Sequence, residues 1–240
     1  MIPRIIHYCW FGRNPLTNLA LKCIASWEKM CPGYEFKLWN EDSFNIAENC
    51  YIEEAYKAKK WAFVSDYVRL KVLYDYGGVY MDTDVEVIKP LDQFLKHKAF
   101  SGFENENWIP TGTMGAEKSN KWIEVLLDYY RDRHFILPDG SFDLTTNVVS
   151  ITENTKRIYP LQLNGKYQDL GDVVFYPSDV FCAKSTIDGR VTVTKNTITI
   201  HHFAGSWAST KSRRIRKLNA LIGKDNVDKL VKVKHFIKGI

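Results

Sequence analysis

Apolar and polar positions change period along the first 90 residues in a way that predicts alternating strands and helices. A largely apolar run at 4–10 and an alternating run at 34–39 predict strands. Between them, apolar residues recur at helical spacing over 18–30, and a further helix is expected over 42–60 behind a capping Asp or Ser. This alternation favours an α/β fold in which helices cover both faces of a largely parallel sheet.

Residues 61–88, WAFVSDYVRLKVLYDYGGVYMDTDVEVI, form the most informative stretch of the chain. Its first half predicts a helix that carries Asp66 and Arg69 and ends at a Gly-Gly pair. A short apolar strand, Val-Tyr-Met, then leads to Asp82 and Asp84, which stand two positions apart. Side chains at that spacing in an extended segment point the same way, so both carboxylates can face one ion.

The second half of the chain predicts shorter elements. The segment 134–170 is polar and irregular, apart from a short helical piece near 145–152. An amphipathic helix is expected at 119–132, and short strands are expected at 85–87, 100–103, 113–116, 173–176 and 192–202.

Length and charge divide the chain into a body at 1–210 and a basic amphipathic tail at 211–240, which has the pattern of two short helices. The tail holds ten Lys and Arg against two Asp, so the body carries −3 of the overall +5. A slightly acidic body lacks the broad basic surface of a nucleic-acid binder, and no nucleic-acid partner is expected. The tail fits either peripheral contact with an anionic membrane or a basic solvent face on helices packed against the body.

Cysteine usage and the N-terminus favour a reducing compartment. The five cysteines are scattered and contain no CxxC pair, which argues against a disulfide framework and against a zinc cluster. The N-terminus lacks the apolar run of a signal peptide, and no stretch approaches the roughly 18–20 apolar residues of a membrane span. We therefore expect a cytoplasmic protein, with the inner face of the membrane as a hypothesis for the tail.

The two aspartates of the Asp-Thr-Asp sequence are candidate ligands of a divalent cation. Mn²⁺ and Mg²⁺ prefer oxygen ligands and often take only one or two protein carboxylates, with waters and substrate phosphate completing the shell. The DxD pattern alone also recurs by chance as a solvated turn after a strand, and spacing leaves both interpretations open.

His201 and His202 end the strand expected at 192–202, ahead of a Gly-Ser pair. Imidazole is a good Mn²⁺ ligand, and the Gly-Ser pair can offer backbone and hydroxyl donors to phosphate. Because adjacent residues of a strand point to opposite faces, at most one of these histidines reaches the ion, and the other is expected to be structural.

Three further residues have chemistry that suits a donor site. Asp66 and Arg69 stand on one helix face, where they form either an acceptor and donor for polyol hydroxyls or a surface ion pair. Trp10 follows the first strand, a position for stacking on a base or for an ordinary core tryptophan. Ligands of open α/β sheets bind at the carboxyl ends of strands, so Trp10 and Asp82 are expected in one cleft. No phosphate loop, dinucleotide fingerprint, GxSxG or catalytic Cys–His signature is present.

Three ordered motifs together resemble glycosyltransferase family 32, and the resemblance covers about residues 1–210. They are IPRIIHYCWFG at the N-terminus, AxxSDxxRxxxLxxxGGxYxDxD at 62–84 and HHFAGSW at 201–207. This family of DxD-containing sugar transferases includes bacterial capsule and lipopolysaccharide enzymes, yeast α-mannosyltransferase-like proteins and relatives of the clostridial glucosylating toxins. The resemblance implies a GT-A fold, a Rossmann-like mixed sheet flanked by helices.

The resemblance implies that five residues contact the nucleotide-sugar donor away from the ion. Tyr8 and Trp10 would come from the first strand, with Trp10 stacked on the base. Asp66 and Arg69 would hold the sugar hydroxyls and act in catalysis. Asn147, in the polar stretch Thr-Thr-Asn, would add a contact to donor or acceptor.

The resemblance also implies the metal site and its cover. Asp84 would bind Mn²⁺ (or Mg²⁺) directly and act in catalysis, Asp82 would contact the ribose or a metal-bound water, and His202 would be the third ligand. Ser206 and Trp207 would close on the diphosphate. The chain departs from its relatives in lacking a lysine between Gly205 and Trp207, so neutralisation of the diphosphate would rest on the ion or on a tail residue such as Lys211.

These assignments predict a metal-dependent, retaining hexosyltransferase in surface polysaccharide synthesis. Its donor would be a UDP-sugar or GDP-mannose, and its acceptor a glycan or a lipid-linked glycan. Two other interpretations remain: a sugar-nucleotide or glycan-binding protein without transfer activity, and another transferase that uses a metal-bound diphosphate.

Overall fold

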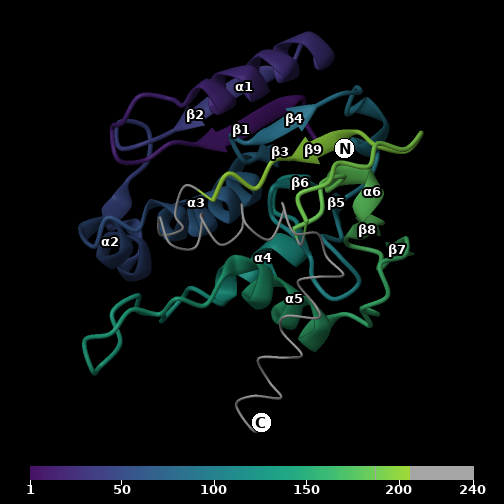
Figure 1. Ribbon diagram of the computed structural model, residues 1–240. Helices are drawn as coiled ribbons and strands as arrows, with labels where there is room; N and C mark the ends of the chain where they lie inside the picture. The colour runs from purple at the N-terminus through teal and green to yellow at the C-terminus, as the bar shows by residue number, and fades with distance from the viewer. Residues whose placement is uncertain (187, 206–240) are drawn as a thin grey trace, which may run out of the picture.

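A seven-stranded mixed sheet forms the centre of the fold (Figure 1) in the computed structural model, which describes residues 1–186 and 188–205. Its strand order is β2-β1-β3-β6-β5-β8-β7. The strands are β1 (Ile5–Cys9), β2 (Glu35–Trp39), β3 (Gly78–Met81), β5 (Ala99–Gly102), β6 (Thr113–Ala116), β7 (Gln168–Asp169) and β8 (Val174–Tyr176).

The sheet combines parallel and antiparallel pairs. Strand β1 lies between β2 and β3 and is parallel to both, as the alternation in the first 90 residues predicts. Strand β6 is antiparallel to β3 and to β5, β5 is parallel to β8, and β7 is antiparallel to β8. The mixed α/β sheet expected from the family resemblance is confirmed.

A second, two-stranded sheet pairs β4 (Val85–Val87) with β9 (Thr199–His201) in antiparallel register. Val85 stands opposite His201. This pairing ties the segment that follows the two aspartates to the last strand of the described chain.

Helices cover both faces of the central sheet (Figure 1). The α-helices are α1 (Asn18–Met30), α2 (Cys50–Lys57), α3 (Trp61–Tyr76), α4 (Lys121–Asp128), α5 (Asn147–Ile158) and α6 (Ser178–Phe181), and two short 3₁₀ helices are η1 (Ile46–Glu48) and η2 (Asp92–Phe94). None of the helices in the described part of the chain is long and apolar enough to cross a bilayer.

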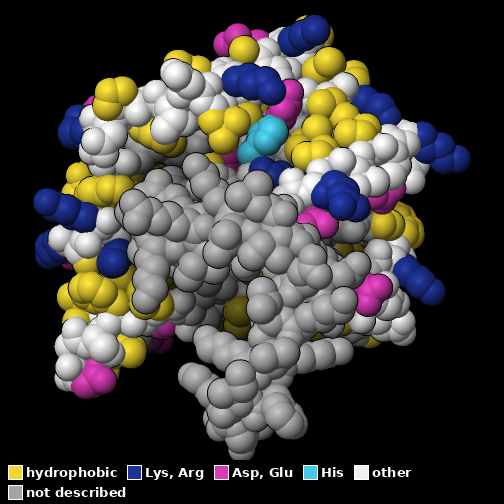
Figure 2. Space-filling view, in the orientation of Figure 1, with side chains coloured by type: hydrophobic (Ala, Val, Ile, Leu, Met, Phe, Trp, Pro, Cys, Tyr) yellow, Lys and Arg dark blue, Asp and Glu magenta, His cyan; other side chains and the backbone are white. Residues whose placement is uncertain are grey.

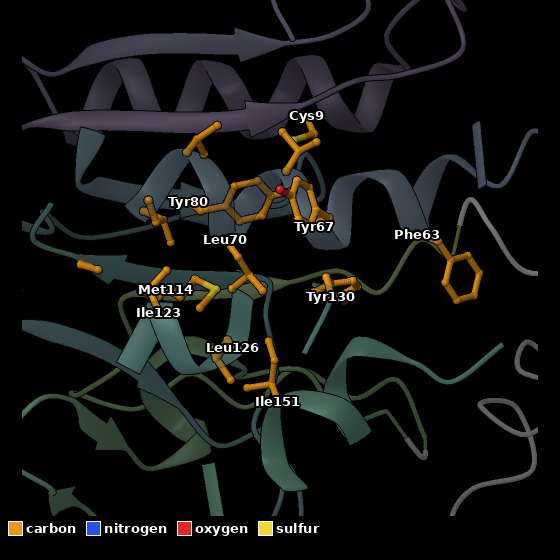
Figure 3. Packing of buried hydrophobic residues seen from close by; sticks show 14 of the residues in the cluster. Cys9, Phe63, Tyr67, Leu70, Tyr80, Met114, Ile123, Leu126, Tyr130 and Ile151 are labelled. Atoms are coloured by element: carbon orange, nitrogen blue, oxygen red, sulfur yellow. The ribbon is translucent and has the colours of Figure 1, made fainter. Parts of the chain in front are cut away.

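The side-chain alternation of β3 divides the interior into two cores. Tyr80 packs with α2, α3, α4 and α5 on one face, and Figure 3 shows it beside Tyr67 and Leu70 of α3. Val79 and Met81 point to the other face, where they pack with α1 and the small sheet. Strand β3 is buried on both faces, so its position at the centre of the fold is well fixed.

Local capping explains where the elements depart from the predicted ranges. The helix expected over 42–60 begins only at Cys50, because the side chains of Asn45 and Asn49 accept hydrogen bonds from the backbone two residues on and separate η1 from α2. The strand expected over 192–202 is confined to β9, because Thr194 and Thr197 form a turn in which a hydroxyl replaces a strand partner. Helix α5 is longer than the piece predicted near 145–152, and α4 is shorter than 119–132.

The Gly-Gly pair between α3 and β3 is held by a buried histidine. Gly77 and Gly78 adopt φ values of 67° and 114°, which suit glycine. His7 Nε2 lies 2.8 Å from the Gly77 carbonyl oxygen, and a Cβ on Gly78 would meet that nitrogen at 2.9 Å. The sharp reversal that delivers β3 to the sheet therefore requires glycine and an adjacent flat ring.

Candidate active site

Asp82 and Asp84 lie in a tight turn between β3 and β4. The backbone N–H of Val85 donates to the Asp82 carbonyl oxygen at 2.9 Å, and Asp82 N–H donates to Gly112 O at 2.9 Å. The prediction of an extended Asp-Thr-Asp segment is therefore wrong, since the turn, and not strand alternation, brings the two carboxylates to one side. Both side chains keep some exposure, 24% for Asp82 and 18% for Asp84. On the face shown in Figure 2, histidine and acidic side chains lie next to each other at the surface.

His201 completes a cluster with these aspartates, which we call the metal seat. One ligand atom from each of Asp82, Asp84 and His201 lies within 4.8 Å of the others. His201 Nε2 is 3.2 Å from Asp84 Oδ1 and 4.0 Å from Asp82 Oδ2. Two carboxylates and an imidazole form a donor set that fits Mn²⁺ or Mg²⁺.

The charges in the seat stabilise one another. Burial by itself raises the pKa of Asp84, but His201 and the Ala204 N–H outweigh it and hold that pKa at about 2. Burial by itself lowers the pKa of His201, but the Asp84 carboxylate raises it well above its usual value. The carboxylate of Asp84 is therefore ionised at neutral pH, and a cation at the seat would take the place of the proton that His201 holds.

The structure does not bring His202 to the carboxylates. Its Nε2 atom lies 2.8 Å from Glu86 Oε2, and Lys22 Nζ lies 3.2 Å from the same oxygen. The register of β9 against β4 directs His201 to the seat and the neighbouring residue to the opposite face. The candidate third ligand in the structure is therefore His201, and not His202 as predicted from the sequence.

Arg69 joins the helix and the strand of the informative stretch. Its Nη2 atom donates to Asp66 Oδ1 at 2.9 Å, and its Nη1 atom lies 3.3 Å from Asp82 Oδ1. Its Nε atom donates to Ser65 O, and the guanidinium lies 4.6 Å from the centre of the Tyr80 ring. With side chains 5% and 10% exposed, Arg69 and Asp66 are not a surface ion pair.

Thr111 and Asn147 complete this group, which we call the sugar-side cluster (Asp66, Arg69, Thr111 and Asn147). The Thr111 hydroxyl accepts from Arg69 Nη1 at 2.7 Å and from Asn147 Nδ2 at 2.6 Å. Asn147 Nδ2 also lies 2.5 Å from Asp66 Oδ1. Burial raises the pKa of Asp66 to about 7, although Arg69 acts in the opposite direction. The structure thus brings Asn147 to the residues with which sequence analysis grouped it.

The two residues predicted from the first strand have separate surroundings. Because β1 and β3 are parallel neighbours, Trp10 and Asp82 both leave the sheet at the same edge. Trp10 is half-buried, and its Nε1 donates to Asn14 O at 2.6 Å. Tyr8 instead packs edge-on against Trp27 of α1, at 5.5 Å between ring centres, on the face away from α3. Ser206, Trp207, Lys211 and the tail lie outside the described residues.

Sequence reasoning missed three residues of the site. Thr111 carries no motif or spacing signal, because its partners come from helices far away in the chain. Tyr80 reads as an apolar strand residue, yet its hydroxyl donates to Asp82 Oδ1 at 3.0 Å. Gly112 lies against the seat, since a Cβ there would be 2.7 Å from His201 Nδ1.

Comparisons with known proteins agree with this architecture. Residues 17–101 match the family model described as a glycosyltransferase sugar-binding region containing a DXD motif. An uncharacterised glycosyltransferase of Acanthamoeba polyphaga mimivirus is 32% identical over 169 residues, which cover 65% of this chain and 67% of the relative. Inositol phosphoceramide mannosyltransferase 3 of Schizosaccharomyces pombe is 29% identical over 126 residues, 51% of this chain and 35% of the relative.

Solved structures with the same fold include the PaToxG glycosyltransferase, with a TM-score of 0.50 at 19% identity over 66% of this chain and 70% of that chain. The apo-form glycosyltransferase GlyE of Streptococcus pneumoniae has a TM-score of 0.52 at 11% identity over 100% of this chain and 64% of that chain. The mixed sheet, with a DXD turn after its central strand, and these neighbours show that the fold is of the GT-A type. The chain belongs to the family of glycosyltransferases with a DXD-containing sugar-binding region. It spans only about a third of the length of the fission-yeast mannosyltransferases that it matches.

Proposed function

We propose that the protein is a metal-dependent, retaining glycosyltransferase that moves a hexose from a nucleotide sugar to a glycan or lipid-linked acceptor in surface polysaccharide synthesis. The observation that carries this proposal is that Arg69 links the metal seat to the sugar-side cluster. Arg69 contacts Asp66 on one side and Asp82 on the other, so one donor molecule can reach both groups. A diphosphate at the seat then places its sugar towards Asp66.

The metal seat is suited to the departure of a diphosphate. A bound Mn²⁺ or Mg²⁺ would neutralise the negative charge that develops on the leaving group as the anomeric bond breaks. Asp84 and His201 hold the binding position, and Tyr80 and Arg69 fix the orientation of Asp82. Each 1.4 kcal/mol of stabilisation that appears only in the transition state is worth about tenfold in rate.

In the sugar-side cluster, we assign sugar recognition to Asp66 and positioning to Arg69. All three guanidinium nitrogens of Arg69 already donate within the protein, to Ser65, Thr111 and Asp66. Oδ1 of Asp66 accepts from both Arg69 and Asn147, and its Oδ2 is the oxygen that we assign to a donor hydroxyl. We therefore propose that Arg69 acts on the sugar indirectly, by holding Asp66 in place, instead of through the predicted direct contact.

The remaining roles rest on the family. We propose that Trp10 stacks on the base, that Ser206 and Trp207 close on the diphosphate, and that transfer retains the anomeric configuration. A UDP-sugar is the first donor to test. The Schizosaccharomyces pombe relatives are named inositol phosphoceramide mannosyltransferases, which adds GDP-mannose as a donor and supports a lipid-linked acceptor. Peripheral membrane contact through 211–240 would suit such an acceptor.

The test is a donor-hydrolysis screen of the purified protein with UDP-glucose, UDP-galactose, UDP-N-acetylhexosamines and GDP-mannose. We expect release of the nucleoside diphosphate from one donor in Mn²⁺ and its loss in EDTA. The anomeric configuration of the released sugar, read by NMR at early times, tests retention. Binding of a donor without turnover would favour a sugar-nucleotide-binding protein, and turnover that persists in EDTA would reject the metal assignment.

A further inference from the structure

Among residues 1–186 and 188–205, the charges at the metal seat leave the diphosphate of a donor incompletely compensated. Asp82 and Asp84 together offset the charge of a divalent ion, and Arg69 is already paired with Asp66 and Asp82. The ammonium of Lys22, on the other side of β4, is paired with Glu86. A group that carries two or more negative charges therefore needs a further cation from the protein.

Lys184 is a cation whose position suits this need. Its Nζ atom donates to the His202 carbonyl oxygen at 2.7 Å, and within residues 1–186 and 188–205 it takes part in no ion pair. Its side chain is half-buried. An ammonium whose partner in the described part of the chain is a neutral carbonyl gains Coulomb attraction when it exchanges that carbonyl for a charged phosphate oxygen.

The backbone places Lys184 next to the seat. Cys182 lies against the ring of His201, and Lys184, two residues further on, reaches the carbonyl of the next residue, His202. The N–H of His202 donates in turn to Asp84 O at 2.9 Å, and the Ala204 N–H donates to Asp84 Oδ2 at 2.7 Å. His202 therefore connects the two residues, because its carbonyl oxygen accepts from the Lys184 ammonium and its N–H donates to Asp84.

The segment that carries Lys184 is held in place by its own backbone pairing. Lys184 forms a β-bridge with Val191. On either side of it, Ser185 N–H donates to Arg190 O at 2.9 Å and Thr192 N–H donates to Ala183 O at 2.8 Å. These hydrogen bonds fix the backbone of Lys184. Its four-carbon stem can still rotate, so the ammonium can turn from the carbonyl towards a phosphate.

We propose that Lys184 binds the diphosphate of the donor, and that its ammonium exchanges the His202 carbonyl for a phosphate oxygen when the donor enters. This inference rests on the proposed function, because it assumes that a metal-bound diphosphate lies at the seat. It adds a donor-binding residue from the loop after α6, a region in which sequence analysis found no functional residue. The charge that Lys184 supplies also remains in place while the leaving group departs.

Binding of inorganic pyrophosphate in excess Mg²⁺, measured by calorimetry, tests this role without a nucleotide, a sugar or turnover. We expect Lys184→Gln to weaken binding roughly 10- to 100-fold, as loss of a charged hydrogen bond does, and Lys184→Arg to retain most of the affinity. Lys89→Gln is the matched control, because Lys89 Nζ also donates to a backbone carbonyl, that of Lys195, at the far end of the small sheet. It should bind as the wild type does.

The outcomes separate the two proposals. If the wild type binds pyrophosphate only with Mg²⁺ and Lys184→Gln binds equally well, the role of Lys184 is overturned and the metal seat stands. If the wild type shows no Mg²⁺-dependent binding, both the seat and the role of Lys184 are overturned. A thermal melt of Lys184→Gln that matches the wild type assigns a loss of binding to the missing cation. If Lys184→Gln melts at a lower temperature than the wild type, the Lys184→Arg variant decides. Should Lys184→Arg bind pyrophosphate as weakly as Lys184→Gln does, the assignment is rejected.

Discussion

His201 Nε2 lies 3.2 Å from Asp84 Oδ1, and the register that pairs Val85 with His201 sets this distance. Asp84 stands directly before β4, and His201 ends β9. Because these strands are far apart in the chain, the metal seat forms only when β9 pairs with β4. The neighbouring histidine is directed to Glu86 by the same register. The fold therefore brings one of two adjacent histidines to the two aspartates.

His201→Ala should lose Mn²⁺ binding, whereas His202→Ala should keep it within a few-fold. The first change removes the only nitrogen ligand of the described cluster, and the second removes a partner of Glu86 on the opposite face. Electron paramagnetic resonance of free Mn²⁺ in a titration measures both affinities. Loss of binding in His202→Ala alone would restore the original assignment of the third ligand.

Asp84→Asn should reduce transfer by at least about 100-fold while the protein stays folded. The amide keeps an oxygen that can accept from the Ala204 N–H, but it lacks the negative charge that attracts a cation. Activity assays with the donor found in the hydrolysis screen measure the loss. Asp75→Asn is the matched control, because Asp75 pairs with Lys71 near the end of α3, away from the seat, and full activity is expected there.

Sequence could predict the elements whose signals are local. Helix α1 occupies the predicted range 18–30, because Thr17 caps it and Cys23 and Trp27 fall on its buried face. The helix that carries Asp66 ends at the Gly-Gly pair, as its sequence indicates. These signals depend on residues within a few positions of one another, so no tertiary information is needed to find them.

Other features depend on contacts that the sequence does not display. Alternation predicts that one of His201 and His202 faces the ion, but only the pairing of β9 with β4 decides which. The role of Thr111 depends on Arg69 and Asn147, which reach it from two different helices. The Asp-Thr-Asp turn is closed by a hydrogen bond between two backbone groups, so the side chains of the turn give no signal of it. The sequence therefore predicts most of the residues that form the site, but it does not predict which of them contact one another.

Thr111→Val should lower the free energy of unfolding by about 1–3 kcal/mol and weaken donor binding, because Arg69 Nη1 and Asn147 Nδ2 lose a shared acceptor in a buried site. Thr111→Ser keeps the hydroxyl and should stay near the wild type in both respects. Urea denaturation and the Michaelis constant for the donor measure the two effects. Equal donor binding by the valine and serine variants would show that Thr111 does not position the sugar-side cluster.

Gly112→Ala should weaken Mn²⁺ binding roughly 10- to 100-fold, which is the typical loss when the surroundings of a metal ligand change. The new Cβ would lie 2.7 Å from His201 Nδ1, so the imidazole must shift from its present position. Gly102→Ala is the control, because its Cβ would meet Phe181 at 3.0 Å in the core. It should lower stability and leave Mn²⁺ affinity unchanged, whereas equal Mn²⁺ affinity in both variants would contradict this account of Gly112.

His7 should make the fold less stable as the pH falls below about 6.5. Burial lowers the pKa of His7 to about 4, and its ring is held neutral between Gly77 O and the Trp39 indole N–H, which donates to Nδ1 at 3.0 Å. The unfolded chain binds a proton near the ordinary pKa of 6.5, so between these values the unfolded state carries more protons and stability rises with pH. The contribution is complete above about 6.5 and falls by about 2 kcal/mol between pH 7 and pH 5.

The difference between the wild type and His7→Gln isolates this effect from other titrating groups. The variant should be less stable at neutral pH, because glutamine cannot reproduce the flat ring between Gly77 and Trp39, and its stability should depend less on pH from 7 to 5. His97→Gln is the comparison, since burial also lowers the pKa of that half-buried histidine, whose Nε2 atom lies 2.7 Å from the Tyr176 hydroxyl oxygen. Urea denaturation at several pH values gives the slopes, and equal slopes for the wild type and His7→Gln would show that His7 is not the group that loses its neutral form on unfolding.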